Sequence, residues 1–153
     1  MTSGGKHYSV HGLVNFKVSG LSPRWDIELR DFETEPKINP DLTLSLGKFS
    51  PQNQDCSILD DKYYIKENYL YGELRYKYVK WHLEIEGFEQ DPTTVRIHSN
   101  ILGRMLIPEL LVFPLIWFKL NEKGYPVVHG SAVSKNGKAC IFAGQGSCGK
   151  TTI

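Results

Sequence analysis

A glycine-rich stretch near the end of the printed sequence has the residue types and spacing of a phosphate-binding loop. Residues 144–152 read Gly-Gln-Gly-Ser-Cys-Gly-Lys-Thr-Thr and match the pattern G-x-x-x-x-G-K-[ST]. In such a P-loop the glycines let backbone N–H groups turn inward and approach phosphate oxygens closely. The sequence therefore predicts a nucleotide-binding site made of Gly144, Gly146, Ser147, Cys148, Gly149, Lys150, Thr151 and Thr152.

Two side chains of this motif are expected to supply charge and metal chemistry. Lys150 would place its ammonium group against the β- and γ-phosphates, and Thr151 would give its hydroxyl to Mg²⁺. A helix that begins near Gly149 would add the positive end of its dipole. We therefore expect ATP or GTP with Mg²⁺ as cofactors, Lys150 as a catalytic residue and Thr151 as a metal ligand. The alternative is a glycine-rich turn after a β-strand that binds no ligand.

The residues before the motif predict a β-hairpin that leads into it. Residues 138–143 form a short apolar run, which is typical of a buried strand. The pair Asn136-Gly137 separates this run from a second strand pattern over 125–134, and it is a strong hairpin signal. The strand that enters the loop is therefore expected to pair antiparallel with its predecessor. In doubly wound nucleotide-binding folds the corresponding strand lies in a parallel sheet, so a different fold is indicated.

The first two thirds of the chain have the alternation of antiparallel β-structure. Apolar residues at every second position predict strands at 10–18, 25–29, 42–46 and 95–97. The aromatic segment 62–86 changes the parity of its apolar residues part of the way along. One strand cannot keep both sets on the same face, so a turn or bulge near 78–80 is predicted.

An apolar segment over 101–120 predicts one buried helix. Pro108 suits the first turn of a helix, whereas Pro114 would kink or shorten it. Charged residues interrupt the segment, and its uninterrupted apolar run is too short to cross a bilayer. The predicted fold class is α+β, with a mainly antiparallel β domain over 1–100. This helix, the hairpin and the P-loop follow over 101–153, as the start of a second domain.

The composition excludes several classes of function. The 153 residues are 41% hydrophobic and 23% charged, and the net charge is +1. The electrostatic footprint of a nucleic-acid-binding protein is therefore absent from the sequence. The 3 cysteines are widely spaced and form no C-x-x-C pair, which argues against a disulfide framework and a zinc site. The polar N-terminus is not a secretory signal, so a cytoplasmic location is expected.

The residues around the predicted hairpin resemble those of a known kinase family. His-Gly-Ser-Ala-Val at 129–133 and Ala-Cys-Ile-Phe-Ala-Gly at 139–144, followed by the P-loop, resemble the HPr serine kinase/phosphorylase group. That group is related in fold to the phosphoenolpyruvate carboxykinases. The resemblance covers roughly residues 125–153. In the family a His-Gly or His-Ala pair lies one hairpin before the P-loop, near the phosphate end of the active site, and His129 matches it.

This resemblance implies a function and a catalytic residue. It implies a phosphoenolpyruvate carboxykinase-like kinase core that depends on Mg²⁺. The phospho-acceptor would be a serine of a protein or peptide, or a small hydroxylated molecule. His129 is then expected to be catalytic together with Lys150. The sequence departs from the family pattern in the loop itself, where Gly146-Ser147 stands in place of the common Ser-Gly. This exchange changes which residue of the loop can adopt a positive φ.

A second departure concerns the carboxylates. Phosphoryl transfer needs carboxylates for Mg²⁺ and for the acceptor hydroxyl, and in this family they follow the P-loop. The pairs Asp60-Asp61 and Glu84/Glu86 are expected instead in a loop and on a solvated strand face. The histidines at 7, 11, 82 and 98 have no ligand spacing. We therefore expect this chain to be the N-terminal part of a truncated kinase core, and to be catalytically silent by itself.

Two other functions stay open. One is a nucleotide-binding regulator without transferase activity, and the other is a β-rich module that binds a protein or peptide and has a vestigial P-loop. The expected partners are a nucleotide and a protein or peptide phospho-acceptor, with no nucleic acid and no membrane, while homo-oligomer formation stays open. A nucleotide that binds only the folded state must raise thermal stability, which distinguishes the binding module from the nucleotide-binding proteins.

Overall fold

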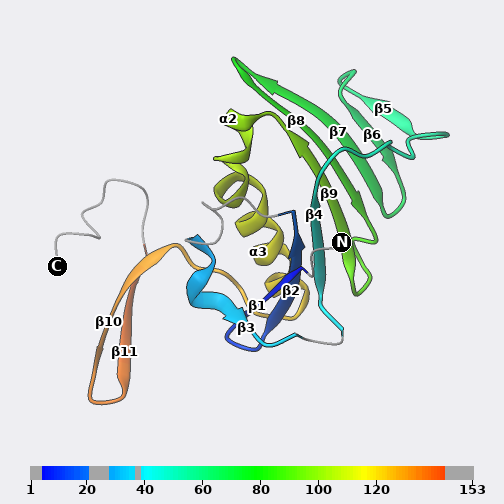
Figure 1. Ribbon diagram of the computed structural model, residues 1–153. Helices are drawn as coiled ribbons and strands as arrows, with labels where there is room; N and C mark the ends of the chain where they lie inside the picture. The colour runs from blue at the N-terminus through cyan, green and yellow to red at the C-terminus, as the bar shows by residue number, and fades with distance from the viewer. Residues whose placement is uncertain (1–4, 21–27, 37–38, 144–153) are drawn as a thin grey trace.

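A mixed β-sheet dominates the protein, as Figure 1 shows. The structure is a computed structural model, and it describes residues 5–20, 28–36 and 39–143. Nine strands form the sheet in the order β3-β1-β2-β4-β9-β8-β7-β6-β5. These strands are β1 (Lys6–Val10), β2 (Val14–Ser19), β3 (Glu33–Thr34), β4 (Leu42–Leu46), β5 (Ser57–Leu59), β6 (Tyr63–Lys66), β7 (Tyr69–Tyr76), β8 (Val79–Glu86) and β9 (Thr93–Ser99).

The predicted predominance of β-structure with one main helix is confirmed, and most pairs of the sheet are antiparallel, but the sheet as a whole is mixed. Strand β4 lies parallel to both of its neighbours, β2 and β9. The remaining pairs of the sheet are antiparallel. Parallel neighbours need a crossover connection rather than a tight turn. Such a pairing joins residues far apart in the sequence, so the alternation within each strand does not reveal it.

The prediction of one strand over 10–18 is wrong, because the alternation of apolar residues continues through a turn. β1 ends at Val10 and β2 begins at Val14, and these two residues face each other in the antiparallel register. His11 and Gly12 both have a positive φ, of 51° and 74°, and they reverse the chain. The apolar residues on either side of the turn still lie on one face, so the period of two persists through the reversal.

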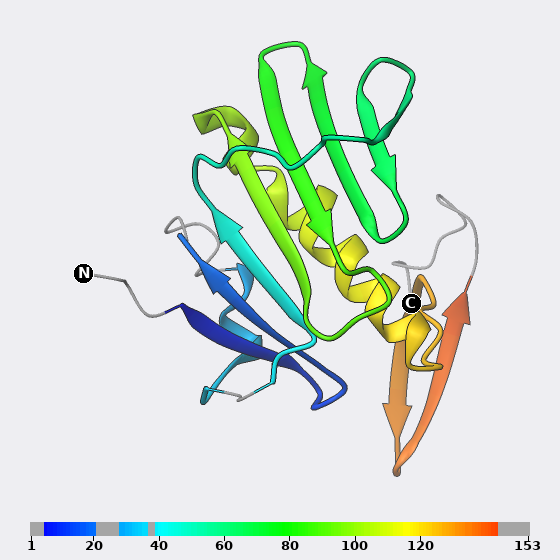
Figure 2. The ribbon, with the colours of Figure 1, turned by 90° about the vertical axis from the view of Figure 1, so that its right-hand side faces the viewer.

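The connection from β4 to β5, residues 47–56, crosses the strands that lie between these two on one side of the sheet (Figure 2). Five strand spacings separate β4 from β5, which amounts to about 24 Å at ~4.8 Å each. The ten connecting residues reach at most about 35 Å when fully extended. This segment must therefore be largely extended, and in Figures 1 and 2 it lies on the opposite side of the sheet from the main helix. We call it the crossing segment.

The turn predicted near 78–80 is confirmed within two residues. β7 ends at Tyr76 and β8 begins at Val79, and Lys77 at the turn has a φ of 51°. Because the turn reverses the chain, the two parities of apolar residues reach the same side of the sheet. Leu74 faces Trp81 across this hairpin, and both belong to the main hydrophobic core or pack against it.

The predicted helix is divided into three parts, and two of them carry a proline in the first turn. They are α2 (Ile101–Arg104), a π-helical segment η2 (Pro108–Val112) and α3 (Phe113–Glu122). A short 3₁₀-helix, η1 (Arg30–Phe32), precedes β3. Only one side of the 101–122 region is buried, whereas Leu110, Trp117 and Phe118 are exposed. Among the described residues no helix is both long enough and apolar enough to cross a membrane.

The helices share one hydrophobic core with the sheet. Ile107, Val112, Leu115 and Ile116 from the helical region lie in the same buried cluster as the inward residues of the central strands. The strand residues of this cluster are Tyr8, Val14, Phe16, Val18, Leu42, Leu44, Trp81, Leu83, Ile85, Val95 and Ile97. The domain boundary predicted at residue 100 falls inside this shared core, and a division of the chain there stays a prediction.

A second sheet consists of the predicted hairpin alone. Strands β10 (Gly130–Lys135) and β11 (Lys138–Ala143) pair antiparallel, and Asn136-Gly137 forms the turn between them, as predicted. Both turn residues have a positive φ, 52° and 73°, which is the geometry of a type I′ turn and requires a residue such as glycine. The first strand is shorter than the predicted range 125–134, because residues 125–129 are irregular.

Glu84 is the most deeply buried carboxylate among the described residues, and it joins three parts of the chain. Its side chain is fully buried and accepts hydrogen bonds from the Tyr69 hydroxyl (2.9 Å), the backbone N–H of Gln52 (2.9 Å) and the Arg96 guanidinium. Arg96 also donates to Glu86 at 2.8 Å. The expectation that Glu84 lies on a solvated strand face is therefore wrong, because the crossing segment covers this part of the sheet.

Replacement of Glu84 by alanine should destabilise the protein by about 2–4 kcal/mol, because removal of one partner leaves the buried donors of Tyr69 and Gln52 unpaired. Urea unfolding measures the change. Glu89→Ala is the matched control, because Glu89 is exposed, and it should change the stability by less than about 0.5 kcal/mol. Equal stabilities of the two variants would contradict the role given to Glu84.

Candidate functional site

The structure describes only one residue of the predicted nucleotide site, His129. It is exposed and lies directly before β10. The predicted P-loop residues Gly144, Gly146, Ser147, Cys148, Gly149, Lys150, Thr151 and Thr152 lie outside the described residues. The nucleotide site and its Mg²⁺ ligand Thr151 therefore stay predictions.

The register of the hairpin nevertheless relates His129 to the start of the P-loop sequence. Gly130 is paired with Ala143 at the open end of the hairpin. His129 precedes the first of these residues and Gly144 follows the second. The two-residue turn at 136–137 fixes this register, because the length and type of a turn determine which residues face each other. The hairpin thus brings the histidine to the same end at which the chain enters the motif.

No metal site accompanies this arrangement in the described part of the chain. Within it, no group of three or more His, Cys, Asp or Glu residues is placed to hold a metal ion. Of the two free cysteines that the structure describes, Cys56 lies in the crossing segment and Cys140 lies on β11.

A second candidate site lies between the crossing segment and the outer side of the sheet. It is a pocket of about 390 Å³. Strands β7, β8 and β9 contribute a tyrosine, a glutamate and two histidines to its lining, and the crossing segment contributes a lysine and two apolar residues. The lining residues are Lys48, Phe49, Pro51, Tyr71, Glu73, His82 and His98. We call this cavity the histidine pocket.

Alternation along the strands brings the polar residues of this pocket together. Tyr71 and Glu73 are two residues apart on β7 and therefore lie on the same side of the sheet. His82 faces Glu73 from β8, and His98 faces His82 from β9. Phe49 from the crossing segment contacts Tyr71 edge to face, with ring centroids 6.3 Å apart.

A chain of hydrogen bonds assigns the proton position on His82. The Tyr71 hydroxyl lies 2.8 Å from Glu73 Oε1 and 3.1 Å from His82 Nδ1. A hydroxyl has one proton to donate, and the charged carboxylate at the shorter distance is the stronger acceptor. Tyr71 therefore donates to Glu73, and His82 must donate its Nδ1 proton to the Tyr71 oxygen. In the neutral ring, Nε2 of His82 then carries the free lone pair.

The surroundings keep Tyr71 and Tyr69 protonated. Burial and the hydrogen bond to Glu73 raise the pKa of Tyr71 well above its usual value of 10.0. Burial and the hydrogen bond to Glu84 raise the pKa of Tyr69 in the same direction. Both hydroxyls therefore act as hydrogen-bond donors over the physiological pH range, and neither serves as a base.

The histidine pocket is suited to binding a polar ligand. Nε2 of His82 can accept a hydrogen bond, and the His98 ring lies next to it with centroids 5.8 Å apart. Lys48 adds a positive charge at the rim. The lining contains no serine, threonine or cysteine that could act as a nucleophile.

No chemistry could be predicted for His82 and His98 from the sequence. The sequence did contain a signal. His82 and Glu84 are two residues apart and so lie on one side of β8, and Arg96 and His98 lie in the same way on one side of β9. That signal becomes informative only when the two strands are known to be paired, with His82 opposite His98.

Of the predicted carboxylate pairs, Asp60-Asp61 is exposed, as expected for a loop.

Comparison with known proteins does not assign the chain to a family. No protein-family model matches it, and neither curated proteins nor solved structures include a significant match.

The tautomer of His82 provides a direct test of the hydrogen-bond chain. Nitrogen-detected NMR at a pH where the ring is neutral should show the proton of His82 on Nδ1. Tyr71→Phe removes the acceptor oxygen and should shift His82 toward the other tautomer, with a loss of stability of about 1 kcal/mol. His129, which is exposed, is the internal control and should not change. A proton on Nε2 of His82 in the wild-type protein would contradict the assignment.

The raised tyrosine pKa values predict a loss of stability at alkaline pH. The folded protein holds these protons more strongly than the unfolded chain, so the contribution is fully present below pH 10. It should decrease as the pH rises above about 10, where the unfolded chain releases its tyrosine protons first. The double variant Tyr69→Phe/Tyr71→Phe should show a flatter decline in unfolding free energy. Tyr125 is exposed, so Tyr125→Phe is the control. Its unfolding free energy should decline with rising pH as that of the wild type does.

Proposed function

We propose that this protein is a P-loop phosphotransferase of the HPr serine kinase type. In this proposal it binds ATP or GTP with Mg²⁺ at residues 144–152 and transfers the γ-phosphoryl group to a hydroxyl. The acceptor is a serine of a protein or peptide, or a small molecule. The single observation that carries the proposal is the match of G-x-x-x-x-G-K-[ST] directly after β11.

The hairpin supports this type of kinase over the doubly wound nucleotide-binding proteins. In the latter, the strand that enters the phosphate loop lies in a parallel sheet. Here β11 is paired antiparallel with β10, in a two-stranded sheet of its own. This pairing agrees with the antiparallel hairpin expected from the phosphoenolpyruvate carboxykinase-like resemblance. The fold of the complete core remains part of the proposal.

The proposed roles follow from charge and position. Lys150 neutralises the charge that develops on the β- and γ-phosphates during transfer, and Thr151 binds Mg²⁺. His129, at the open end of the hairpin, donates a hydrogen bond to the transferred phosphoryl group or moves a proton at the acceptor hydroxyl. The exposure of His129 supports this role, because a ligand can reach its ring.

The histidine pocket favours a second candidate function, a β-rich binding module. Its polar lining and its size of about 390 Å³ suit a small polar ligand or a peptide side chain. In that case the P-loop sequence is vestigial. A third candidate keeps nucleotide binding but lacks transfer, as in a regulator. Nucleotide binding separates the second candidate from the other two, and phosphoryl transfer separates the first from the third.

Thermal unfolding with Mg-ATP tests nucleotide binding. The protein is used at the length that its native source produces. A nucleotide at 100 times its dissociation constant should stabilise the folded state by about 2.7 kcal/mol. Lys150→Ala should abolish this increase. The matched control is Lys135→Ala, an exposed lysine of the same hairpin, which should keep the full increase. An unchanged melting temperature with ATP and with GTP would refute the proposal and favour the binding module.

Transfer of labelled phosphate tests the kinase itself. Serine-containing peptides and proteins of the native source are offered as acceptors together with γ-labelled ATP and Mg²⁺. His129→Ala should lower the transfer rate by about 10²- to 10⁴-fold while nucleotide binding persists, because proton transfer contributes to catalysis in this range. His11→Ala, at an exposed turn of the other sheet, should leave the rate unchanged. Nucleotide binding without any transfer would favour the regulator.

A further inference from the structure

The helical region 101–122 buries one side against the sheet and leaves its other side exposed (Figure 1). The exposed side is apolar along most of its length. Seven large apolar side chains on it are between 37% and 81% exposed, namely Ile101, Leu102, Met105, Leu106, Leu110, Trp117 and Phe118. We call this surface the apolar stripe.

The positions of the apolar stripe recur with the period of a helix. Leu102, Leu106 and Leu110 follow each other in steps of four residues, which places them on one side. Two further steps of four lead to Phe118. The buried residues Ile107, Val112 and Ile116 alternate with them and belong to the main core. The exposed apolar side chains therefore form one continuous surface.

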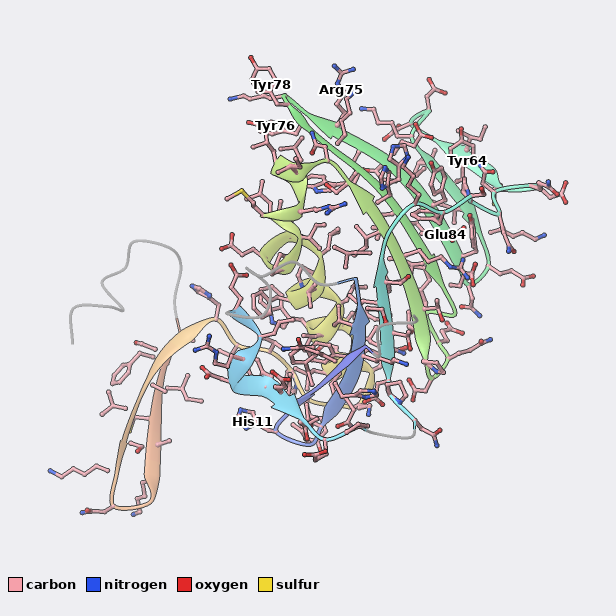
Figure 3. All side chains as sticks on the ribbon, viewed as in Figure 1. His11, Tyr64, Arg75, Tyr76, Tyr78 and Glu84 are labelled. Carbon is pink, nitrogen blue, oxygen red and sulfur yellow. The ribbon has the colours of Figure 1, made fainter. Side chains whose placement is uncertain are left out.

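At its N-terminal end the apolar stripe forms one wall of a cavity of about 360 Å³. Leu102, Met105 and Leu106 line this wall, and the turn residues 76–79 of the β7–β8 hairpin line the other. Tyr76 and Tyr78 are 65% and 80% exposed, and Figure 3 shows both at the free end of the hairpin. We call this cavity the tyrosine hollow.

Hydrogen bonds fasten the two walls of the tyrosine hollow to each other. The Asn100 side chain donates from Nδ2 to the carbonyl of Tyr78 at 2.6 Å, and its Oδ1 accepts from the N–H of Gly103 at 3.0 Å. Trp81 Nε1 donates to the carbonyl of Gly103 at 3.1 Å. The hollow is therefore preformed, and binding to a preformed site loses less conformational entropy.

This face of the molecule carries few charges. Between residues 101 and 118 the sequence contains one arginine, Arg104, and one glutamate, Glu109, whose charges balance. The lining of the tyrosine hollow adds Lys77. Depletion of charged residues is typical of the centre of a protein–protein interface, and interfaces between identical subunits are the most apolar.

The exposed apolar area is large enough for a stable dimer. Nine side chains, seven from the apolar stripe and two tyrosines from the hollow, are each about half exposed. At ~200 Å² for a large side chain, this amounts to roughly 900 Å². A stable interface buries about 800 Å² on each partner.

The spacing along the apolar stripe makes this face complementary to itself. Trp117 stands seven residues after Leu110, and Gly103 stands seven residues before it. If two copies pack their helical regions antiparallel with Leu110 on the two-fold axis, Trp117 of one copy reaches the level of Gly103 in the other. The tyrosine hollow lies there, between Leu102 and Leu106. Two-fold symmetry forms this contact twice.

We propose that the apolar stripe and the tyrosine hollow form the interface of a homodimer with two-fold symmetry. Leu110 contacts its counterpart on the axis, and Trp117 of each copy enters the tyrosine hollow of the other. The two Lys77 side chains lie at opposite ends of this interface and do not oppose it. The proposal does not depend on nucleotide binding.

The geometry favours a second copy over two other occupants. A peptide side chain would fill the tyrosine hollow but would leave the apolar stripe from Leu110 to Phe118 in water. A membrane-binding face combines apolar residues with several Lys or Arg, whereas the charges of Arg104 and Glu109 balance here. A second copy covers both the stripe and the hollow.

Sedimentation velocity tests the association. The protein is used at the length that its native source produces, at concentrations from 1 to 100 µM. It should sediment as a dimer at the upper concentrations, and the dependence on concentration gives the dissociation constant.

Two variants and two matched controls locate the interface. Leu110→Asp places two carboxylates together on the axis and should weaken the dimer at least about 100-fold. Trp117→Ala should weaken it at least about tenfold, because buried tryptophans are frequent hot spots. Ile58→Asp on β5 and Phe142→Ala on β11 make the same kinds of change at exposed positions elsewhere and should leave the dimer unchanged. Circular dichroism and the melting temperature establish that each variant is folded.

Oxidative cross-linking tests the position of the axis. Leu110→Cys should form a disulfide with its own counterpart, because a residue on the two-fold axis meets itself. In the matched variant Asn121→Cys the two thiols lie about 33 Å apart along the helices, so they should not pair. The wild-type protein gives the background from its natural cysteines.

Each alternative outcome overturns the proposal. This applies if the protein is a monomer at 100 µM, if Leu110→Asp and Trp117→Ala dimerise like the wild type, or if Leu110→Cys cross-links no faster than Asn121→Cys. For a monomer, cosedimentation with phosphatidylserine-containing vesicles identifies the occupant. Vesicle binding that Leu110→Asp abolishes would indicate a lipid surface, and no vesicle binding would indicate a different protein.

Discussion

The burial of one carboxylate determines how the outer side of the sheet is built. A charged carboxylate can leave water only when donors surround it, and Glu84 finds them on β7, β9 and the crossing segment. The backbone N–H of Gln52 belongs to a connection that has to span five strand spacings with ten residues. Its attachment to Glu84 places Phe49 and Pro51 over the sheet, where they form one wall of the histidine pocket. The pocket thus depends on an ion network that is not itself part of its lining.

Local patterns in the sequence were sufficient for the local features of the fold. The change of apolar parity in 62–86 predicted the reversal between β7 and β8, because a strand has only two sides. Asn136-Gly137 predicted the second hairpin, because few residue pairs adopt a positive φ twice in succession. The apolar segment after residue 100 predicted the main helix, although Pro108 and Pro114 divide it into parts. In each case the residues that determine the structure are neighbours in the chain.

Features that depend on distant residues could not be predicted in the same way. The alternation over 10–18 continues through the His11-Gly12 turn, so the pattern could not distinguish one strand from a hairpin. The parallel neighbours of β4 join segments separated by crossover connections, and no local signal records such pairing. Glu84 looked solvated because the segment that covers it lies more than 30 residues earlier in the sequence. The histidine pocket needs the register of three strands, whereas a P-loop can be proposed from sequence because its chemistry requires residues that are close together in the chain.

The separate position of the β10–β11 hairpin has a consequence for local unfolding. Both strands have only each other as partners in their sheet, and Ser131 alone among their residues is not exposed. Figures 1 and 2 show the hairpin extending away from the nine-stranded sheet. A two-stranded ribbon without further cover is only marginally stable, so its amide protons should exchange with solvent through openings that leave the main sheet intact. The segment that leads into the glycine-rich motif would then be the least protected cooperative unit of the described chain. A ligand or partner that orders it would be detected first as slower amide exchange there.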